Sequence, residues 1–244
     1  MALLPNNRDE LRKRWESGER FDFYFFYGHK APVSGVDASC LSQWFQRVFQ
    51  IDGVDYPTAE HWMMAEKARL FDDDVMLAEI LSSDGPKEAK AFGRKVRGFD
   101  NDVWNDRRVE IVKRGNLAKF GQHDDLKSFL LSTSTIDTLD QYGAVAESNH
   151  SFQIDKSPEN DGSATKDRLR IYPDPSDTEQ LGDAQADQTS GNSTVILVEA
   201  AGRDTIWGIG LGKSNPKSLD PFLWRGRNLL GFVLTAVREE LRGR

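Results

Sequence analysis

The pattern of apolar and polar residues predicts strands near both ends of the chain and helices between them. FDFYFFYG (residues 21–28) is an aromatic run of strand length that ends in glycine. Asp52-Gly53 lies between two apolar runs and predicts the tight turn of a β-hairpin. TVILVEA (residues 194–200) is short and rich in β-branched residues, which favours a buried strand.

Helical patterns dominate the middle of the chain. Thr58 can cap a helix that begins near Ala59 and continues through EHWMMAEKARLF. DVMLAEILSS predicts a second helix. PKEAKAFGRKV predicts a third, and its proline occupies a favourable first-turn position.

Two further helices and a loop complete the pattern. VWNDRRVEIVKRGNLAKFGQ predicts a fourth helix with an apolar stripe of Val109, Val112 and, more loosely, Leu117 and Phe120. TIWGIGLG reads as a strand that passes into a glycine-rich loop, and NLLGFVLTAVREELR as a final helix whose last-turn arginines suit the helix dipole. Together these elements predict an α+β fold, mostly helical, with a small β-sheet.

One segment of different composition interrupts this pattern. Residues 141–193 are rich in Ser, Asp, Asn, Gly, Gln and Pro, so they bury too little apolar surface to offset the conformational entropy lost on folding. We therefore expect a disordered acidic insertion, with RLRIYP as its one candidate for a short strand. Residues 21–140 and 194–244 would form a single domain, and residues 1–20 a helical extension.

The net charge of −7 belongs to that insertion. Residues 140–194 hold eleven acidic and four basic side chains, and the rest of the chain holds 28 of each. The acidic balance therefore does not exclude a phosphate-bearing ligand elsewhere. The chain has no run of about 18 apolar residues, and its N-terminus lacks the apolar core of a signal peptide. These features predict an intracellular, cytoplasmic protein without a membrane partner, and leave a nuclear location open.

The metal-binding residue types occur without the spacing of a metal site. Cys40 is the single cysteine, so it can form no internal disulfide and no zinc-thiolate site by itself. It is either a nucleophile or, more commonly for a lone cysteine, a small packed hydrophobe. The four histidines have no ligand spacing, so we expect neither a metal nor a cofactor.

Glu60 and Lys67 are the first candidates for chemistry. Seven residues at about 100° each place them on the same side of a helix, roughly 20° apart and two turns from each other. A carboxylate and an ammonium presented from an apolar wall suit acid–base or nucleophilic work, because desolvation and mutual pairing shift both pKa values. The alternative is a solvent-exposed ion pair on the surface of the helix.

The glycine-rich stretch WGIGLGKS is a weaker candidate. Trp207 stands where a Walker loop needs its first glycine, and the spacing is not GxGxxG either. Gly208 and Gly210 could let backbone amides approach an anion or a sugar. The alternative is a sharp bend from strand to loop.

Four further positions could contact a ligand. Trp104 and Trp207 could stack on a nucleobase or ribose, or simply pack in the core. Asp204 could be a second carboxylate of the site, or a plain turn residue. The segment from Arg225 to Asn228 opens the last helix, so its amides and guanidinium groups could cradle a phosphate, or the segment could be a solvated basic loop.

Four blocks in a fixed order resemble the NADAR family, the YbiA-like N-glycosidases: YPTAEHWMMAEKARLF, VWNDRRVEIVKRGNLAKF, LVEAAGRDTIWGIGL and WRGRNLLGFVLTAVREEL. The resemblance covers most of residues 21–139 and 194–242. It implies hydrolysis of an N-glycosidic bond between a base-like amine and the anomeric carbon of a phosphorylated ribose. FFYGH (residues 25–29) is more similar to members that act on ADP-ribose than to the short bacterial pathway enzymes.

The resemblance also implies which residues form the site. The essential glutamate of the family falls on Glu60 and its helix lysine on Lys67; with Asp204 they make the predicted catalytic set. The predicted substrate-binding set is Tyr27, Gly28, Trp104, Arg107, Trp207, Gly208, Gly210, Arg225 and Asn228.

The expected activity is hydrolysis of an ADP-ribosyl conjugate, with ADP-ribosylated guanine in DNA or RNA as substrate, by a monomer. Three alternatives stay open: hydrolysis of ribosylamino-pyrimidine phosphates of riboflavin synthesis, ADP-ribose binding without cleavage, and an adaptor whose acidic insertion recruits a partner. In the enzyme, Glu60 would stabilise an oxocarbenium-like centre or position the attacking water. Lys67 would protonate the leaving amine or attack the anomeric carbon to form an imine.

Overall fold

The computed structural model describes residues 4–134 and 194–244. Within these two stretches the chain forms seven α-helices, two 3-10 helices and four strands. In chain order they are α1 (Arg8–Glu16), β1 (Phe21–Phe26), η1 (Ala38–Leu41), β2 (Phe49–Ile51), β3 (Val54–Tyr56), α2 (Ala59–Leu70), α3 (Asp74–Leu81), α4 (Pro86–Gly93), α5 (Asn101–Gly121), α6 (Asp124–Ser132), β4 (Thr194–Glu199), η4 (Pro216–Leu219) and α8 (Leu229–Arg242). The predicted acidic insertion, with RLRIYP, lies outside the described residues.

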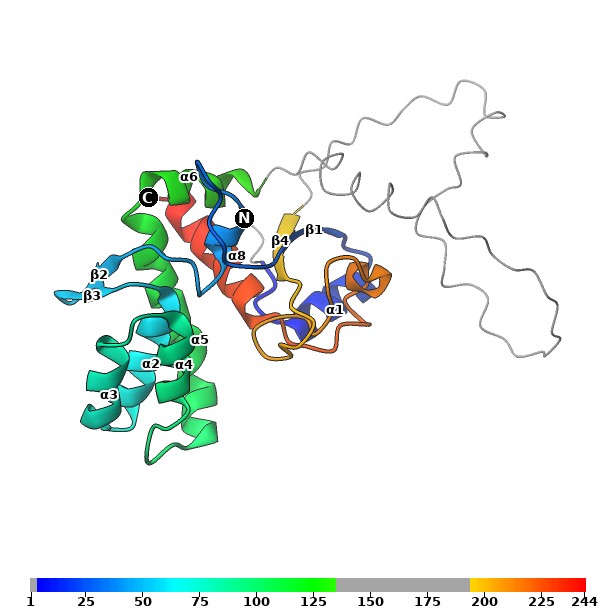
Figure 1. Ribbon diagram of the computed structural model, residues 1–244. Helices are drawn as coiled ribbons and strands as arrows, with labels where there is room; N and C mark the ends of the chain where they lie inside the picture. Colours follow the sequence, from blue (N-terminus) through cyan, green and yellow to red (C-terminus); the bar gives the residue numbers. More distant parts are fainter. Residues whose placement is uncertain (1–3, 135–193) are drawn as a thin grey trace, which may run out of the picture.

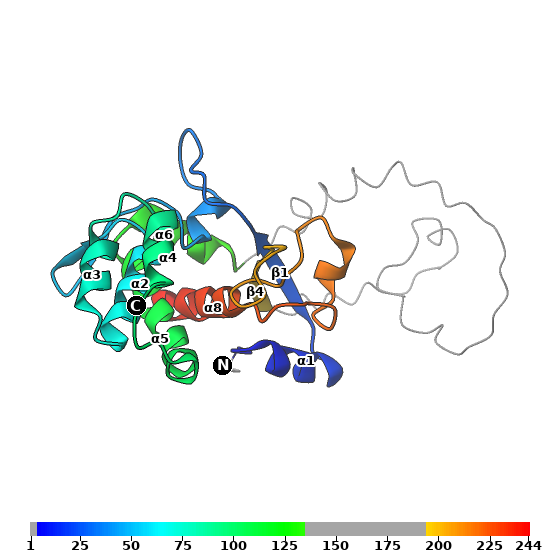
Figure 2. The same cartoon turned by 60° about the horizontal axis from the view of Figure 1, so that its bottom comes forward.

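The elements form the predicted α+β fold, in which helices predominate. Figure 1 shows α2, α3, α4 and α5 gathered on one side of the molecule and the pair of β1 and β4 on the other. Helix α8 runs between these two groups, as the turned view in Figure 2 also shows, and it packs on both α5 and β4. The helical group and the strand pair are therefore joined along α8.

Strands β1 and β4 pair in parallel although they lie far apart in the sequence. Phe21 stands opposite Thr194 and Phe26 opposite Glu199. Most of their apolar side chains are buried, which agrees with the near-continuous apolar runs of both segments. Both strands therefore end at the same edge, and the carboxyl ends of parallel strands are where ligand sites commonly form.

The hairpin of β2 and β3 is confirmed. Asp52 and Gly53 both have left-handed backbone angles, with φ of 52° and 79°, as a type I′ turn requires. The cap of α2 is confirmed as well, because the Thr58 hydroxyl accepts a hydrogen bond from the His61 amide. The turn and the cap together fix where α2 begins.

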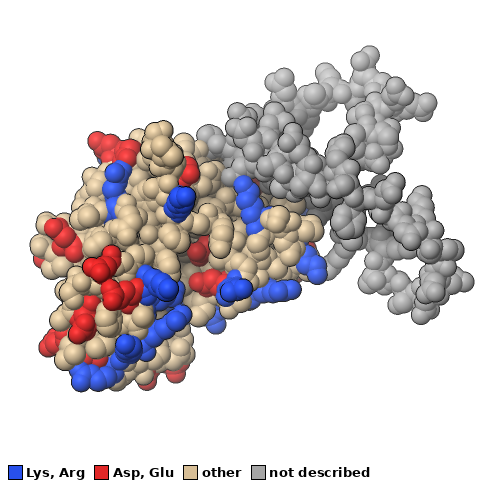
Figure 3. Space-filling view, in the orientation of Figure 1, with Lys and Arg blue, Asp and Glu red and all other residues tan. Residues whose placement is uncertain are grey.

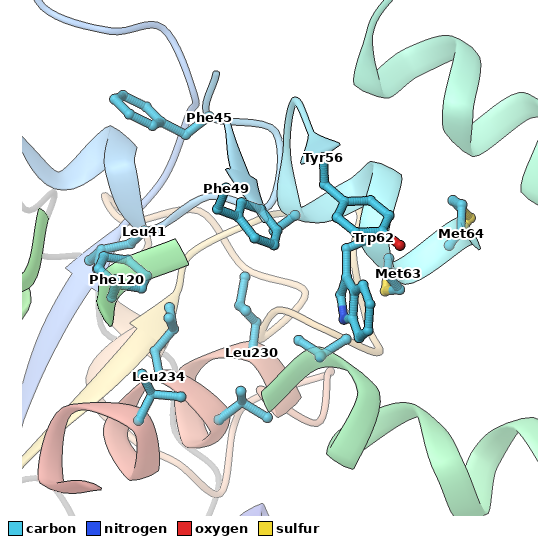
Figure 4. Packing of buried hydrophobic residues seen from close by; sticks show 14 of the residues in the cluster. Leu41, Phe45, Phe49, Tyr56, Trp62, Met63, Met64, Phe120, Leu230 and Leu234 are labelled. Carbon is cyan, nitrogen blue, oxygen red and sulfur yellow. The ribbon is translucent and has the colours of Figure 1, made fainter. Parts of the chain in front are cut away.

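Helix α2 is buried on nearly all sides, since α3, α4 and α5 pack against it. In the core shown in Figure 4, the ring of Trp62 stands at 87° to that of Tyr56. Trp62 Nε1 also donates a hydrogen bond of 2.7 Å to the carbonyl of Ile111 on α5. The two helices approach this closely at Gly115, where an added Cβ would lie 2.2 Å from the Trp62 ring. Tight packing thus holds α2 in place.

The predicted apolar stripe of α5 is partly wrong. Val112 and Phe120 are buried, but Val109 is 40% exposed. The helix instead buries Trp104 and Arg108, which precede Val112 at four-residue spacing. Arg108 thus occupies a buried position of α5, which a pattern based on apolar residues could not indicate.

The strand predicted over TIWGIGLG is also wrong, since residues 205–212 form a loop. The amide of Ile209 donates to the carbonyl of Glu199, which directs the loop back across the end of β4. Gly208 allows this path, because an added Cβ would lie 2.8 Å from that same carbonyl. The glycines therefore serve a bend, as the alternative interpretation had it.

The first twenty residues contain the expected helix, α1. Its Leu11 is fully buried, and Arg12 donates hydrogen bonds to the carbonyls of Pro221 and Phe222. Helix α1 therefore packs on the loop that precedes α8. None of the helices in residues 4–134 and 194–244 has the length and apolar character of a membrane span.

Candidate active site

Two cavities adjoin at the edge where β1 and β4 end. The larger has a volume of about 600 Å³ and the smaller about 120 Å³, and the side chain of Lys90 on α4 lines both. Figure 3 shows acidic side chains recessed in the middle of this face with basic side chains to either side. The smaller cavity is lined by Glu60, Met63, Met64, Lys67, Lys90, Gly93, Arg94, Trp104 and Trp207.

Seven residues of the predicted site surround these cavities. Glu60, Lys67, Trp104 and Trp207 meet at the smaller one. Tyr27, Gly28 and Asp204 lie at the larger one, together with side chains that no pattern in the sequence had indicated. Segments from opposite ends of the chain therefore converge, as the predicted site requires.

Glu60 is buried in the first turn of α2, with only 2% of its surface exposed. Lys90 Nζ stands 3.6 Å from Glu60 Oε1, and the Trp44 side chain lies beside the carboxyl. Burial raises the pKa of Glu60, while Lys90 and Trp44 oppose that rise. Oε1 has no hydrogen-bond partner among the described residues. The alternative of an exposed surface ion pair is therefore wrong.

Lys67 lines the same cavity but forms no salt bridge to Glu60 within the described part of the chain. Its Nζ donates a hydrogen bond of 2.7 Å to the carbonyl of Gly93 and lies 4.1 Å from the ring centre of Phe99 and 5.9 Å from that of Trp104. Burial lowers the pKa of Lys67. The expected mutual pairing is thus wrong, because the cation beside Glu60 is Lys90.

Glu199, the last residue of β4, is a site residue that the sequence reasoning missed. It lines the larger cavity, and its Oε2 has no hydrogen-bond partner among the described residues. Burial raises the pKa of Glu199 to about 8, with a further contribution from Asp204 and Glu60, against the opposing effect of Lys90. An acidic residue that ends an otherwise apolar strand could have indicated this position.

Asp204 is a turn residue and also lines a cavity, so both interpretations of it that the sequence left open apply. Its Oδ1 accepts hydrogen bonds from the amides of Ile206, at 2.9 Å, and Trp207, at 2.8 Å, as in an Asx turn. The residue also lines the larger cavity beside Glu199. The turn therefore orients both the carboxyl of Asp204 and the start of the segment that carries Trp207.

The backbone amides at the start of α8 are not available for the predicted phosphate cradle. The amides of residues 226–230 donate to the carbonyls of residues 205–209, so these donors are already used. Asn228 is fully buried, and its side-chain amide bonds the Leu197 carbonyl and the Glu199 amide, each at 3.0 Å. Arg225 is exposed and lines neither cavity. This segment fixes β4 and the loop rather than forming an amide nest.

Three further positions of the predicted binding set have other surroundings. Gly208 and Gly210 line neither cavity. Gly210 has φ of +68°, and an added Cβ there would lie 2.9 Å from Arg225 Cβ, so both glycines serve close packing. Arg107 is exposed, whereas the adjacent Arg108 is buried with an Nε that has no partner in the described residues.

Cys40 and His61, two of the residues considered for metal or thiol chemistry, are packed in the interior. Cys40 is buried, and burial raises its pKa to about 12, which suits a packed hydrophobe and not a thiolate nucleophile. His61 is buried with its ring nitrogens near Thr58 Oγ1 and the Ser83 carbonyl. Among the described residues, no three His, Cys, Asp or Glu side chains gather as a metal site.

The arrangement is equipped for proton transfer within a partly desolvated site. Glu60 is a buried carboxyl and Glu199 a half-buried one, each with a raised pKa and an oxygen that has no hydrogen-bond partner among the described residues, and Lys67 is an amine whose pKa is lowered. Groups whose pKa values are shifted in this way are suited to proton transfer. Trp104 and Trp207 add aromatic surface beside them.

Comparisons with known proteins agree with this geometry. The chain matches the NADAR domain over residues 25–142 and 188–242. It is 30% identical to an N-glycosidase of Acanthamoeba polyphaga mimivirus across 89% of this chain and 95% of that protein. It is 31% identical to the N-glycosidase YbiA of Escherichia coli across 35% of this chain and 51% of that protein. The NMR structure of E. coli YbiA shares the fold, with a TM-score of 0.54 and 20% identity across 91% of this chain and 86% of that one.

Proposed function

Because the chain belongs to the NADAR family, we propose that it hydrolyses the bond between a base amine and the anomeric carbon of ribose in an ADP-ribosyl conjugate. The protein is a hydrolase of N-glycosyl bonds, in keeping with its N-glycosidase relatives. Its substrate in this proposal is ADP-ribosylated guanine in nucleic acid. The observation that carries the proposal is a pair of adjoining cavities that share Lys90, with a buried carboxyl, Glu60, in the smaller one.

The sizes of the cavities support a ligand of two parts. The smaller, between Trp104 and Trp207, offers aromatic surface to a ring. The larger, about 600 Å³, is in the range of sites that enclose a cofactor-sized ligand. Lys30 and Lys90 supply cationic groups along it, and they replace the start of α8 as the proposed contacts for phosphate.

The roles of the site residues follow from their surroundings. Glu60, whose Oε1 has a cation 3.6 Å away but no hydrogen-bond partner among the described residues, positions the attacking water or stabilises the positive charge that develops on the anomeric carbon. Asp204 holds a ribose hydroxyl. Lys67, with its pKa lowered by burial, is the candidate nucleophile for an imine with the opened sugar and a candidate proton donor for the leaving amine.

Substrate choice is tested by incubating the protein with two compounds separately and following products by mass spectrometry. We expect release of ADP-ribose and an unmodified base from an oligonucleotide that carries ADP-ribosylated guanine. Turnover of a ribosylamino-pyrimidine phosphate alone would reassign the substrate to the riboflavin pathway. Quantitative recovery of both compounds, with binding retained, would make the protein a binding module.

The imine is tested by adding borohydride during turnover. A covalent route should leave a sugar adduct on Lys67 that is detected by peptide mass mapping. If no adduct forms and Lys67→Arg remains active, water attacks the anomeric carbon directly.

A further inference from the structure

Cleavage of an N-glycosidic bond needs a proton donor for the departing nitrogen as well as a group that directs water. Glu199 has the surroundings of such a donor. Its carboxyl stands at the carboxyl end of β4 and lines the larger cavity, with Oε2 unpartnered among the described residues. Its backbone amide is held by Asn228 Oδ1 at 3.0 Å, so the position of the strand end is fixed.

The charged groups nearest to Glu199 differ from those nearest to Glu60. Asp204 and Glu60 face Glu199 with negative charge, and Lys90 faces both glutamates with positive charge. Lys90 lies 3.6 Å from Glu60 Oε1, and no salt bridge joins it to Glu199 within the described residues. The other titratable groups along the cavity are Tyr27, His29, Lys30 and Asp37. Burial favours the neutral form of both carboxyls, and the ion pair with Lys90 opposes this at Glu60, whereas Glu199 has no such pair among the described residues.

We propose that Glu199 is the general acid of the reaction and that Glu60 is its ionised counterpart. As the carbon–nitrogen bond breaks, its electron pair goes to nitrogen, which takes the proton of the Glu199 carboxyl. Water then adds to the anomeric carbon and gives a proton to the Glu60 carboxylate. Loss of that proton to solvent and uptake of one by Glu199 restore both groups. This assignment rests on the proposed function. In it Glu199, and not Lys67, is the proton donor.

The test compares two leaving groups in wild-type protein and in Glu199→Gln. A guanine conjugate needs a proton to depart, whereas a pyridinium N-riboside departs as neutral pyridine and needs none. We expect Glu199→Gln to lose at least ~10²-fold in kcat on the first substrate and to lose little on the second. Glu199→Asp, which keeps a carboxyl, should recover part of the rate on the first. Glu79→Gln, on the exposed surface of α3, is the matched control and should change neither rate.

A second readout does not depend on turnover. The infrared band of a protonated carboxyl, present in wild-type protein and absent in Glu199→Gln, should disappear as pH rises through about 8. The rate on the guanine conjugate should fall over the same pH range in wild-type protein, and Glu199→Gln should lack this alkaline limb.

The outcomes separate the two proposals. Equal loss on both leaving groups, or a Glu199 that is already ionised at neutral pH, would overturn Glu199 as the acid while the N-glycosidase activity stands. A wild-type protein that cleaves neither N-glycoside would refute the proposed function, and with it the role of Glu199, even if the infrared band titrates as expected.

Discussion

Charged side chains are withdrawn from solvent in two regions of the protein, and the two regions differ in how far their hydrogen bonds are satisfied. In the packed interior, Lys119 donates to the carbonyls of Cys40 and Ser42, and Arg238 to groups of Thr133 and Val195. At the cavities, Glu60 is also buried and Glu199 is half-buried, yet each keeps an oxygen without a hydrogen-bond partner in the described residues. A buried polar group that has its hydrogen bonds stabilises the fold, whereas one that lacks them is available to a ligand. The difference separates structural charges from candidate catalytic ones.

The largest effect should come from Glu60→Gln, which keeps the shape of the side chain and removes its charge. We expect a loss in kcat of ~10²–10⁴-fold, about 3–5 kcal/mol of transition-state stabilisation. The free energy of unfolding should stay the same or rise, because a poorly compensated buried carboxyl is gone. Turnover kinetics and urea unfolding measure the two quantities. Near-normal turnover, or a large loss of stability, would place Glu60 with the structural charges.

Arg238→Met should show the opposite signature. The change leaves the carbonyls of Thr133 and Val195 without their donor, so the free energy of unfolding should fall by about 2–4 kcal/mol. The kcat of the protein that remains folded should be unchanged, because Arg238 lines neither cavity. Urea unfolding, with kcat measured at low temperature, tests both statements. Lost activity at unchanged stability would contradict the comparison.

Lys90→Gln tests whether Lys90 controls the ionisation of Glu60. Lys90 lowers the pKa of Glu60, so its removal should raise that pKa and reduce the ionised fraction of Glu60 at neutral pH. We expect a loss of rate at pH 7 with partial recovery at higher pH, because the acid limb of the pH–rate profile moves upward with the pKa of Glu60. The pH–rate profile measures the shift of its acid limb, and Lys95→Gln on the exposed surface near Phe92 is the control. An unmoved limb would remove Lys90 from the electrostatics of Glu60.

The smallest expected effect is the change of the free energy of unfolding with pH. Glu199 at the cavities and Lys119 in the packed interior should change it in opposite directions. The folded state raises the pKa of Glu199 from 4.5 to about 8, so it binds more protons than the unfolded state in that range and stability should fall as pH rises. It lowers the pKa of Lys119 from 10.5 to about 7, so the unfolded state binds more protons there and stability should rise with pH.

Each slope is at most about 1.4 kcal/mol per pH unit. Unfolding free energies measured from pH 5 to 10 test these signs. Glu199→Gln should remove the fall between about pH 4.5 and 8 and leave the rise above 7 in place. A slope that survives the substitution would assign the titration to other groups.

The parts of this molecule that could be predicted are those that depend on neighbours in the sequence. Helical spacing places Glu60 and Lys67 at one cavity. The Thr58 cap fixes the start of α2, and Asp52-Gly53 forms the turn between β2 and β3. Spacing within one helix could not reveal the cation beside Glu60, because Lys90 belongs to another helix and reaches it through the packing of α4 on α2.

Longer-range contacts account for the remaining errors. Glu199 reads as the end of an apolar strand until β4 is placed beside Asp204 and Lys90. The bend over residues 205–212 arises from hydrogen bonds to β4 and to the start of α8, which sequence propensity does not contain. These hydrogen bonds also occupy the amides of residues 226–230, which are therefore not available to bind a phosphate.

The parallel pairing of β1 with β4 determines when the protein becomes active. During synthesis β1 leaves the ribosome long before its partner strand, and its apolar face must wait for β4 and α8. Pairing of segments so distant in the chain is slow, because loop closure comes before the contacts that reward it. A nascent chain that already carries Glu60 and Trp104 still lacks Glu199. The chain can therefore gain catalytic competence only after β4 and α8 have been synthesised.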